Sequence, residues 1–170
     1  NEFAVLPVEL KPYHELQEMK NPLFSILMKG VSYLGNASIA AVLIAATMTI
    51  FALRHQWIES IFMLATATSA LLTLILKYMI HRARPIPIAE NAAGLIESIS
   101  RYSYPSGHVL LFVVFFGFFA YLAWIHFSGR ARAIAVTVCT ALIILIGPSR
   151  VFLGAHWASD VVGGYIIGTM

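Results

Sequence analysis

Three short polar segments stand where apolar runs end, and together they hold an unusual collection of side chains. The segments are Lys77 with Arg84-Pro85, Pro105-Ser106-Gly107-His108, and Ser149-Arg150 with His156 and Asp160. They supply three permanent cations, two imidazoles and one carboxylate. A charge at the edge of a bilayer or inside it must be neutralised or used. This collection therefore predicts a site that binds and processes a phosphate group.

The first segment is ambiguous when it is taken alone. Lys77 and Arg84 are seven residues apart, close to two helical turns, so they share a face if a helix continues between them. Pro85 disfavours helical backbone at Arg84, which predicts that the helix ends near there. The pair is more typical of a membrane-edge cluster, in which Lys77, Arg82 and Arg84 extend to lipid headgroups.

The second segment opens an apolar run. Ser106 is suited to cap a helix, and Gly107 allows the backbone to approach a ligand closely. The free N–H groups at a helix start bind anions, and His108 would lie in the first turn. An ordinary cap beside an interfacial histidine explains this segment equally well.

The third segment pairs a histidine with a carboxylate. His156 and Asp160 are four residues apart, which makes them neighbours on one helical face. A lone carboxylate within an apolar run is costly, so Asp160 needs a partner, and His156 is the nearest. Such a pair would fix the imidazole tautomer and stabilise its cation, as a histidine nucleophile or base requires. A purely structural ion pair is less favoured, because Arg150 and His108 belong to the same face.

The composition places the chain in a membrane. Of its 170 residues, 59% are hydrophobic and 11% are charged, whereas soluble domains have about a quarter charged residues. The net charge of +3 is small, and no basic stretch with interleaved aromatics occurs, so we expect no nucleic-acid partner. Oligomeric state cannot be predicted from these features.

The apolar runs predict an all-α, polytopic transmembrane helical bundle of about five to six spans. The runs cover about residues 31–53, 57–80, 106–127, 132–148 and 155 onwards. A helix of 22 residues is roughly 33 Å long, which matches a hydrocarbon core of about 30 Å. The runs do not alternate in polarity, as barrel strands would. Tryptophans near the run ends fit interfacial anchors, namely Trp57, Trp124 and Trp157.

The order of the spans brings the polar segments together. Counting spans puts the long 81–105 loop and the 149–156 turn on one side of the membrane. The short turns on the opposite side are rich in arginine, at Arg54, Arg130 and Arg132, which favours a cytoplasmic position for those turns. We therefore expect an integral protein of a bacterial inner membrane, with its polar segments facing outward.

The three segments resemble the type 2 phosphatidic acid phosphatase family, whose signature is shared with bacterial acid phosphatases and vanadium-dependent haloperoxidases. The matching pattern is Lys77, six residues, Arg84-Pro85, then Pro105-Ser106-Gly107-His108, then Ser149-Arg150, five residues, His156, three residues, Asp160. All signature positions hold the expected residue types over about residues 77–160. Membrane members usually have six spans, and this chain departs from them at its ends.

The resemblance implies a role for each residue and implies no metal or cofactor. His156 would attack phosphorus to form a phosphohistidine, and Asp160 would orient it. His108 would protonate the leaving alkoxide and then activate water. The phosphate-binding residues would be Lys77, Arg84, Ser106, Gly107 and Arg150.

The residues also predict a domain organisation, because a stretch of mixed polar and apolar residues precedes the apolar runs. We expect residues 1–30 to form an interfacial amphipathic segment, with a solvated linker as the alternative, and residues 31–170 to form the transmembrane phosphatase domain. The chain begins with Asn1 and stops at Met170 within an apolar run, so we expect it to lack spans at one or both ends.

These expectations predict a phosphatase acting on a lipid phosphate, such as phosphatidic acid, phosphatidylglycerol phosphate or a polyprenyl diphosphate. Three alternatives stay open. A phosphotransferase would pass the phosphohistidine to another lipid. A non-catalytic lipid-phosphate carrier would need the cations but not the histidines. A metallohydrolase is disfavoured, because three nearby cations oppose a divalent metal.

Overall fold

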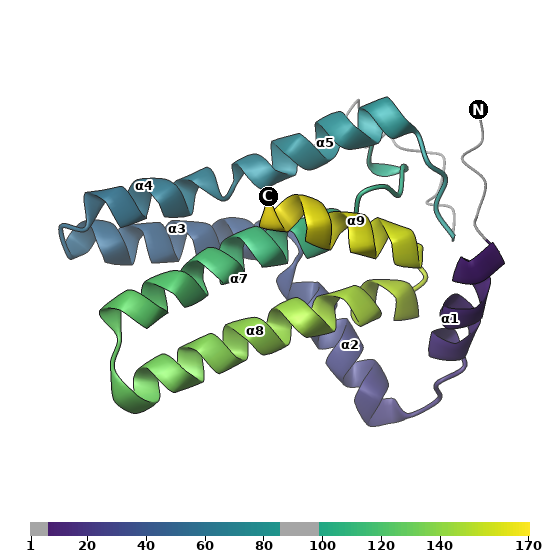
Figure 1. The fold of residues 1–170 in the computed structure, drawn as a ribbon, viewed down its shortest axis with the longest axis horizontal. Coiled ribbons are helices and arrows are strands. Elements are labelled where there is room, and N and C mark those ends of the chain that lie inside the picture. The colour runs from purple at the N-terminus through teal and green to yellow at the C-terminus, as the bar shows by residue number, and fades with distance from the viewer. Residues whose placement is uncertain (1–6, 86–98) are drawn as a thin grey trace.

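The structure, a computed structural model, describes residues 7–85 and 99–170, and every regular element in these ranges is a helix (Figure 1). The middle of the expected 81–105 loop, at 86–98, and residues 1–6 lie outside the described residues. The predicted all-α architecture is confirmed. Three helical stretches are long and apolar enough to cross a membrane: Trp57–Ile80, Gly107–His126 and Gly129–Phe152.

The first and last apolar runs differ in detail from straight spans. The first is divided between α2 (Pro22–Leu34) and α3 (Ala37–Leu53), which meet at an angle of 62° and form a fourth span if they are counted together. The last gives α9 (Ala158–Thr169), whose 12 residues extend only about 18 Å. The described residues therefore hold three or four candidate spans, against the five apolar runs of the sequence.

The N-terminal region contains two helices. Part of the 1–30 segment is helical, as α1 (Pro7–Gln17), and its position at the membrane interface stays a prediction. α2 begins after Asn21, whose side chain accepts hydrogen bonds from the backbone N–H groups of Leu23 (2.9 Å) and Phe24 (3.3 Å). Pro22 at the first helical position has no N–H that needs a partner.

The remaining helices surround α7 (Gly107–His126). One apolar cluster joins it to α2, α8 (Gly129–Phe152) and α9, and its buried members are Val31, Val109, Phe112, Val113, Ile146, Val151 and Val161. A second joins it to α3 and α4 (Trp57–Ala65), through Ile44, Phe51, Met63, Phe115 and Leu122. After a break at Thr66 and Ala67, α5 (Thr68–Ile80) also packs on α7. Burial on several sides fixes the start of α7, where the second polar segment lies.

Small residues allow α9 to lie close against α7. A Cβ atom at Gly164 would stand only 3.0 Å from the backbone oxygen of Ser106. At the same junction, the backbone N–H of Ser106 donates to the carbonyl of Asp160 at 3.0 Å. This close packing of small residues, common between membrane helices, brings the second and third polar segments together.

A tyrosine supports α8 just before its functional end. Pro148 lies inside α8 and removes one backbone donor from the helix. The hydroxyl of Tyr165, from α9, accepts from the N–H of Gly147 (3.2 Å) and donates to the carbonyl of Ile143 (2.6 Å). It thus bridges backbone groups next to the proline and fixes the turn that carries Arg150.

Candidate active site

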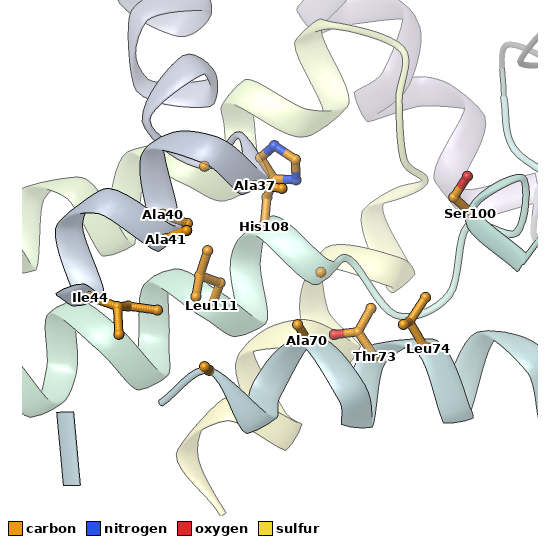
Figure 2. A pocket seen from close by; sticks show the side chains of 13 residues that line it. Ala37, Ala40, Ala41, Ile44, Ala70, Thr73, Leu74, Ser100, His108 and Leu111 are labelled. Carbon is orange, nitrogen blue, oxygen red and sulfur yellow. The ribbon is translucent and has the colours of Figure 1, made fainter. Parts of the chain in front are cut away.

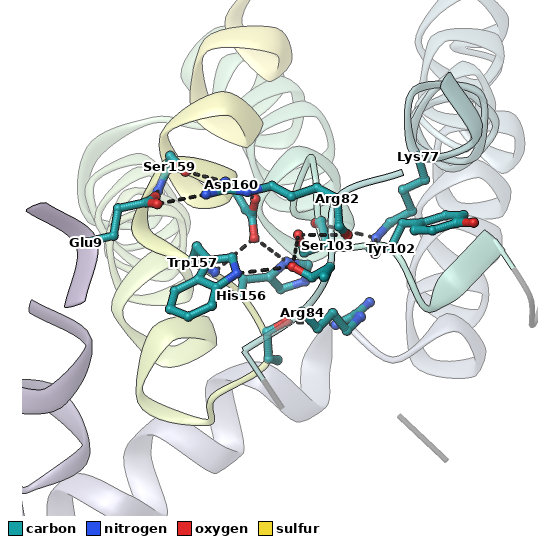
Figure 3. Close-up of polar contacts among 12 residues, drawn as sticks. Glu9, Lys77, Arg82, Arg84, Tyr102, Ser103, His156, Trp157, Ser159 and Asp160 are labelled. Atoms are coloured by element: carbon teal, nitrogen blue, oxygen red, sulfur yellow. Dashed lines mark hydrogen bonds and ion pairs between the residues drawn. The ribbon is translucent and has the colours of Figure 1, made fainter. Parts of the chain in front are cut away.

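The three polar segments converge at one end of the bundle. Lys77 lies in the last turn of α5, Arg150 in that of α8, and His108 in the first turn of α7. His156 lies in the turn before α9, and Arg84 follows α5 (Figure 3). His108 interacts electrostatically with the other four side chains. The two imidazoles therefore belong to one site.

Backbone carbonyl groups hold two of the three cations. Lys77 is only 5% exposed, and its Nζ donates to the carbonyls of Tyr102 and Ser103. Arg84 donates to the carbonyls of Ser100 (2.8 Å) and Ala155 (2.8 Å). Burial lowers the pKa of Arg84, while the charge of Asp160 opposes this shift. Lys77 therefore does not extend to lipid headgroups, as the alternative interpretation of its cluster expected.

The third cation is anchored from a different helix. Arg150 donates through Nη1 to the hydroxyl of Ser32 in α2, and its Nε is buried without a partner in the described part of the chain. Within the described ranges, none of Lys77, Arg84 and Arg150 forms an ion pair with a carboxylate. Their positive charge is therefore available to an anion.

The second segment begins α7 as the sequence predicts, but its serine does not cap the helix. Ser106 occupies the N-cap position with extended backbone, and its side chain makes no capping hydrogen bond. Its Oγ and the Nε2 of His108 are both buried without hydrogen-bond partners among the described residues. Both atoms keep their full capacity for a ligand, and Gly107 contributes the first N–H of the helix.

The third segment forms the expected histidine–carboxylate pair. The Nδ1 of His156 lies within ion-pair distance of Oδ2 of Asp160, at 3.5 Å, but makes no hydrogen bond among the described residues; both side chains are almost fully buried. Oδ2 also accepts the backbone N–H of Trp157 at 2.8 Å. Burial, followed by the positive charges of Arg84, Arg150 and Lys77, lowers the pKa of His156 well below its ordinary value. The imidazole is therefore neutral at physiological pH, with a lone pair to donate.

Sequence reasoning missed a close contact of Asp160. The Nη1 of Arg82 lies 2.7 Å from Oδ1 of Asp160, and its Nη2 lies 2.7 Å from Oε2 of Glu9 in α1. Arg82 was assigned to the headgroup cluster, but it is only 7% exposed. The signal that could have found it is the need for a cation beside a buried carboxylate.

Two further residues of the site gave no clear sequence signal. Ser103 is fully buried, and its N–H donates to the carbonyl of Arg82 at 2.8 Å, which joins the segments before and after the loop. Trp157 was expected at the membrane interface. It is instead 9% exposed, and its Nε1 donates to the carbonyl of Ala83 at 3.1 Å. Both residues stabilise the backbone that carries the charged groups.

An apolar cavity of about 450 Å³ opens beside His108 (Figure 2). Its wall comes mainly from α3, α5 and α7, with Ala37, Ala40, Ala41, Ile44, Ala67, Ala70, Thr73, Leu74 and Leu111 among the lining residues. Gly107 and His108 line it at the polar end. A ligand with an apolar body in this cavity would therefore place its end beside His108.

Substitution of Gly35, which is not one of the charged groups, tests the importance of the position of His108. A Cβ atom there would lie 2.4 Å from Cδ2 of His108, so alanine must displace the imidazole. The backbone φ of −87° at this position suits alanine. We expect Gly35→Ala to lower phosphate release by about 10- to 100-fold, as small misplacements of catalytic groups do. Turnover of the purified variant measures this.

The matched control for this substitution is Gly30→Ala. Gly30 lies in α2, and nothing stands within 4 Å of a Cβ atom built on it. We expect this variant to keep wild-type turnover. Equal turnover of the two variants would mean that the position of His108 does not matter.

Comparison with known proteins places the chain among membrane phosphatases. The PAP2 superfamily model matches residues 58–170. Phosphatidylglycerophosphatase B of Bacillus subtilis (strain 168) is 31% identical over 157 residues, which are 89% of this chain and 73% of that protein. Undecaprenyl-diphosphatase of Sulfolobus acidocaldarius is 31% identical over 97 residues, 55% of this chain and 41% of that protein.

A solved structure extends the similarity to the fold. The crystal structure of a transmembrane PAP2-type phosphatidylglycerolphosphate phosphatase from Bacillus subtilis superposes with a TM-score of 0.77 at 26% identity. The match covers 95% of this chain and 79% of that one. The helices that carry the polar segments are therefore arranged as in a membrane phosphatase.

Proposed function

The chain belongs to the PAP2 superfamily, and we propose that it is a membrane-embedded phosphatase that hydrolyses the phosphate group of an amphiphilic lipid. The observation that carries this proposal is the charge arrangement of the pocket. Three cations, of which Lys77 is buried and Arg84 and Arg150 are partly buried, surround two imidazoles and have no carboxylate partner in the described ranges. Phosphoryl transfer depends mainly on such positioning and charge neutralisation.

The histidines divide the reaction into two steps. Because Nδ1 of His156 faces Asp160, its Nε2 is the atom that attacks phosphorus. A P–N bond forms, the bond from phosphorus to the lipid oxygen breaks, and His108 gives that oxygen a proton. Water then attacks phosphorus, His108 takes its proton, and the P–N bond breaks to release inorganic phosphate. Asp160 stabilises the charge that His156 gains.

The cations and the helix start bind the phosphoryl oxygens. Lys77 at the end of α5, Arg84 after it and Arg150 at the end of α8 reach the site from different places in the chain, so they can surround a dianion on several sides. The Oγ of Ser106 and the N–H of Gly107 add uncharged donors at the start of α7. Donors fixed in a site that excludes water stabilise developing charge strongly.

The apolar cavity supports a lipid as the substrate. Its position beside His108 would seat an acyl or prenyl chain between α3, α5 and α7, with the phosphate at the charged groups. Relatives include a phosphatidylglycerophosphatase and an undecaprenyl-diphosphatase. We therefore propose a substrate of the phosphatidic acid, phosphatidylglycerol phosphate or polyprenyl diphosphate type.

Phosphate release from these lipids tests the proposal. We expect the purified protein to release inorganic phosphate from at least one lipid phosphate, with full activity in EDTA and inhibition by vanadate, which mimics the phosphoryl group in transfer. A water-soluble phosphate monoester provides the contrast and should react far more slowly.

Two outcomes would contradict this expectation. Activity lost in EDTA and restored by a divalent metal would favour a metallohydrolase. Transfer of phosphate to an added lipid alcohol, without free phosphate, would favour the phosphotransferase alternative.

We also propose that the site faces outward from a bacterial inner membrane. The supporting observation is that Arg54 follows α3 and Arg130 begins α8, at turns that lie at the end of the bundle opposite to the site (Figure 1). Labelling of intact cells by a membrane-impermeant maleimide tests this in a Cys139→Ala background. We expect labelling of Ala83→Cys, beside the site, and none of Ser128→Cys at the opposite end. The reverse pattern would show the opposite orientation.

A further inference from the structure

We propose that Arg82 and Glu9 are positioning residues for catalysis, with Arg82 fixing Asp160 and Glu9 of α1 fixing Arg82. On this view the N-terminal helix completes the active site rather than only resting beside it. The inference rests on the proposed function, because it assumes that Asp160 orients the nucleophile His156.

A continuous chain of short contacts links α1 to the nucleophile. Arg82 contacts Oδ1 of Asp160 through Nη1 and Oε2 of Glu9 through Nη2, both at 2.7 Å (Figure 3). Nη1 also donates to the hydroxyl of Ser159, and the other oxygen of Glu9 accepts the N–H of Ser159 at 3.0 Å. Arg82, Glu9 and Asp160 are 7%, 3% and 0% exposed. Little solvent is therefore present to weaken these interactions.

These contacts give the two carboxylate oxygens of Asp160 different partners. Arg82 binds Oδ1 of Asp160, which leaves Oδ2 for the N–H of Trp157 and the imidazole of His156. The guanidinium thus sets the rotation of the carboxylate, and through it the tautomer and direction of the ring. Because both Nη atoms of Arg82 are engaged in these contacts, Arg82 differs from the cations that serve the phosphate.

The charges predict an order of effects that simple loss of packing does not. In Arg82→Gln, Glu9 and Asp160 lose the cation between them, and their mutual repulsion disfavours the charged form of Asp160. In the double variant with Glu9→Gln, that repulsion is gone. The double variant should therefore be more active than Arg82→Gln alone. If Arg82 and Glu9 only supported the fold, the two losses would add and the double variant would be the weaker.

Kinetics of the full chain on a lipid phosphate test this order. We expect Arg82→Gln to lower kcat about 10- to 100-fold, as loss of supporting contacts does elsewhere, with KM changed by less than about threefold. Arg82→Lys keeps the positive charge but lacks the two terminal nitrogens of the guanidinium group. Its kcat should therefore lie between those of wild type and Arg82→Gln. Glu9→Gln should lose only a few-fold, and the double variant should recover at least about threefold over Arg82→Gln. Lys11→Gln, an exposed change on the same helix, is the control.

Several results would overturn the inference. One is a kcat for Arg82→Gln within about twofold of wild type. Another is a loss of kcat/KM in Arg82→Gln that comes from a higher KM alone. The third is a double variant with a lower kcat than Arg82→Gln. If Arg82→Gln does not fold, as thermal unfolding would show, Arg82→Lys decides, because a wild-type kcat there excludes the role. If wild type releases no phosphate, or His156→Ala keeps full activity, the proposed function itself fails.

Discussion

Substitution of His156 by alanine is expected to lower kcat for phosphate release by about 10⁴-fold or more, a loss typical of a missing nucleophile. The variant keeps the three cations and the apolar cavity, so binding of the lipid should change little. The contact between Nδ1 of His156 and Asp160 is lost in this variant, but Asp160 keeps Arg82 as an ion-pair partner. Turnover and lipid binding, measured on the same preparation, separate the two effects.

A second histidine gives the control for this experiment. His14 lies on the exposed side of α1, and we expect His14→Ala to keep wild-type turnover. Trapping adds a direct measurement: radioactive phosphate should stay on wild-type protein in an acid-labile form after a rapid quench, and His156→Ala should carry none. A variant that still turns over within tenfold of wild type would favour the carrier alternative, or a nucleophile elsewhere.

The composition of the site explains how it keeps its charge. Carbonyl oxygens neutralise less of a cation than a carboxylate does, yet they satisfy its N–H groups. Lys77 and Arg84 both use carbonyls, from Tyr102, Ser100 and Ala155. The one strong cation–carboxylate pairing in the described part of the site belongs to Arg82, which we assign to positioning. Cations that are buried without a neutralising partner cost free energy in the protein without ligand. Binding of a dianionic phosphate relieves this cost and is therefore favoured.

The sequence predicts the meeting of the three segments because that needs only the order of the apolar runs. Helices that alternate across a membrane return every second connection to the same side, so His108 and His156 had to share a face. Within that face, the four-residue spacing of His156 and Asp160 fixes their contact through local helix geometry. Contacts that depend on local spacing and on the order of the spans can therefore be predicted from the sequence.

Contacts that depend on tertiary packing cannot be predicted from the sequence in this way. Arg82 and Glu9 are 73 residues apart, and nothing local indicates that a helix at the start of the chain reaches a carboxylate near its end. The bend of 62° between α2 and α3 was also missed, because Gly35 and Asn36 interrupt an apolar run without changing its overall hydropathy. Trp157 shows the same limit, since an aromatic near a run end suits either the interface or a packed site.

The second large effect is expected at His108, and the leaving group should reveal its role. For a lipid phosphate, the departing alkoxide needs a proton, so His108→Ala should lower kcat about 10²- to 10⁴-fold. An aryl phosphate carrying an alkyl chain releases a phenolate that leaves without a proton. The first step should then proceed in the variant, while the second step still lacks its base.

The variant should therefore release one phenolate per protein molecule in a fast burst and then nearly stop, with phosphate retained on His156. Wild type should continue past the burst at a steady rate. Rapid-mixing absorbance and the acid-labile phosphate content measure the two products independently. Steady turnover of the aryl phosphate by His108→Ala would remove the role as base, and unchanged turnover of the lipid phosphate would remove the role as acid. Because the burst requires His156 to attack phosphorus before His108 activates water, it also tests the order of the two steps in one experiment.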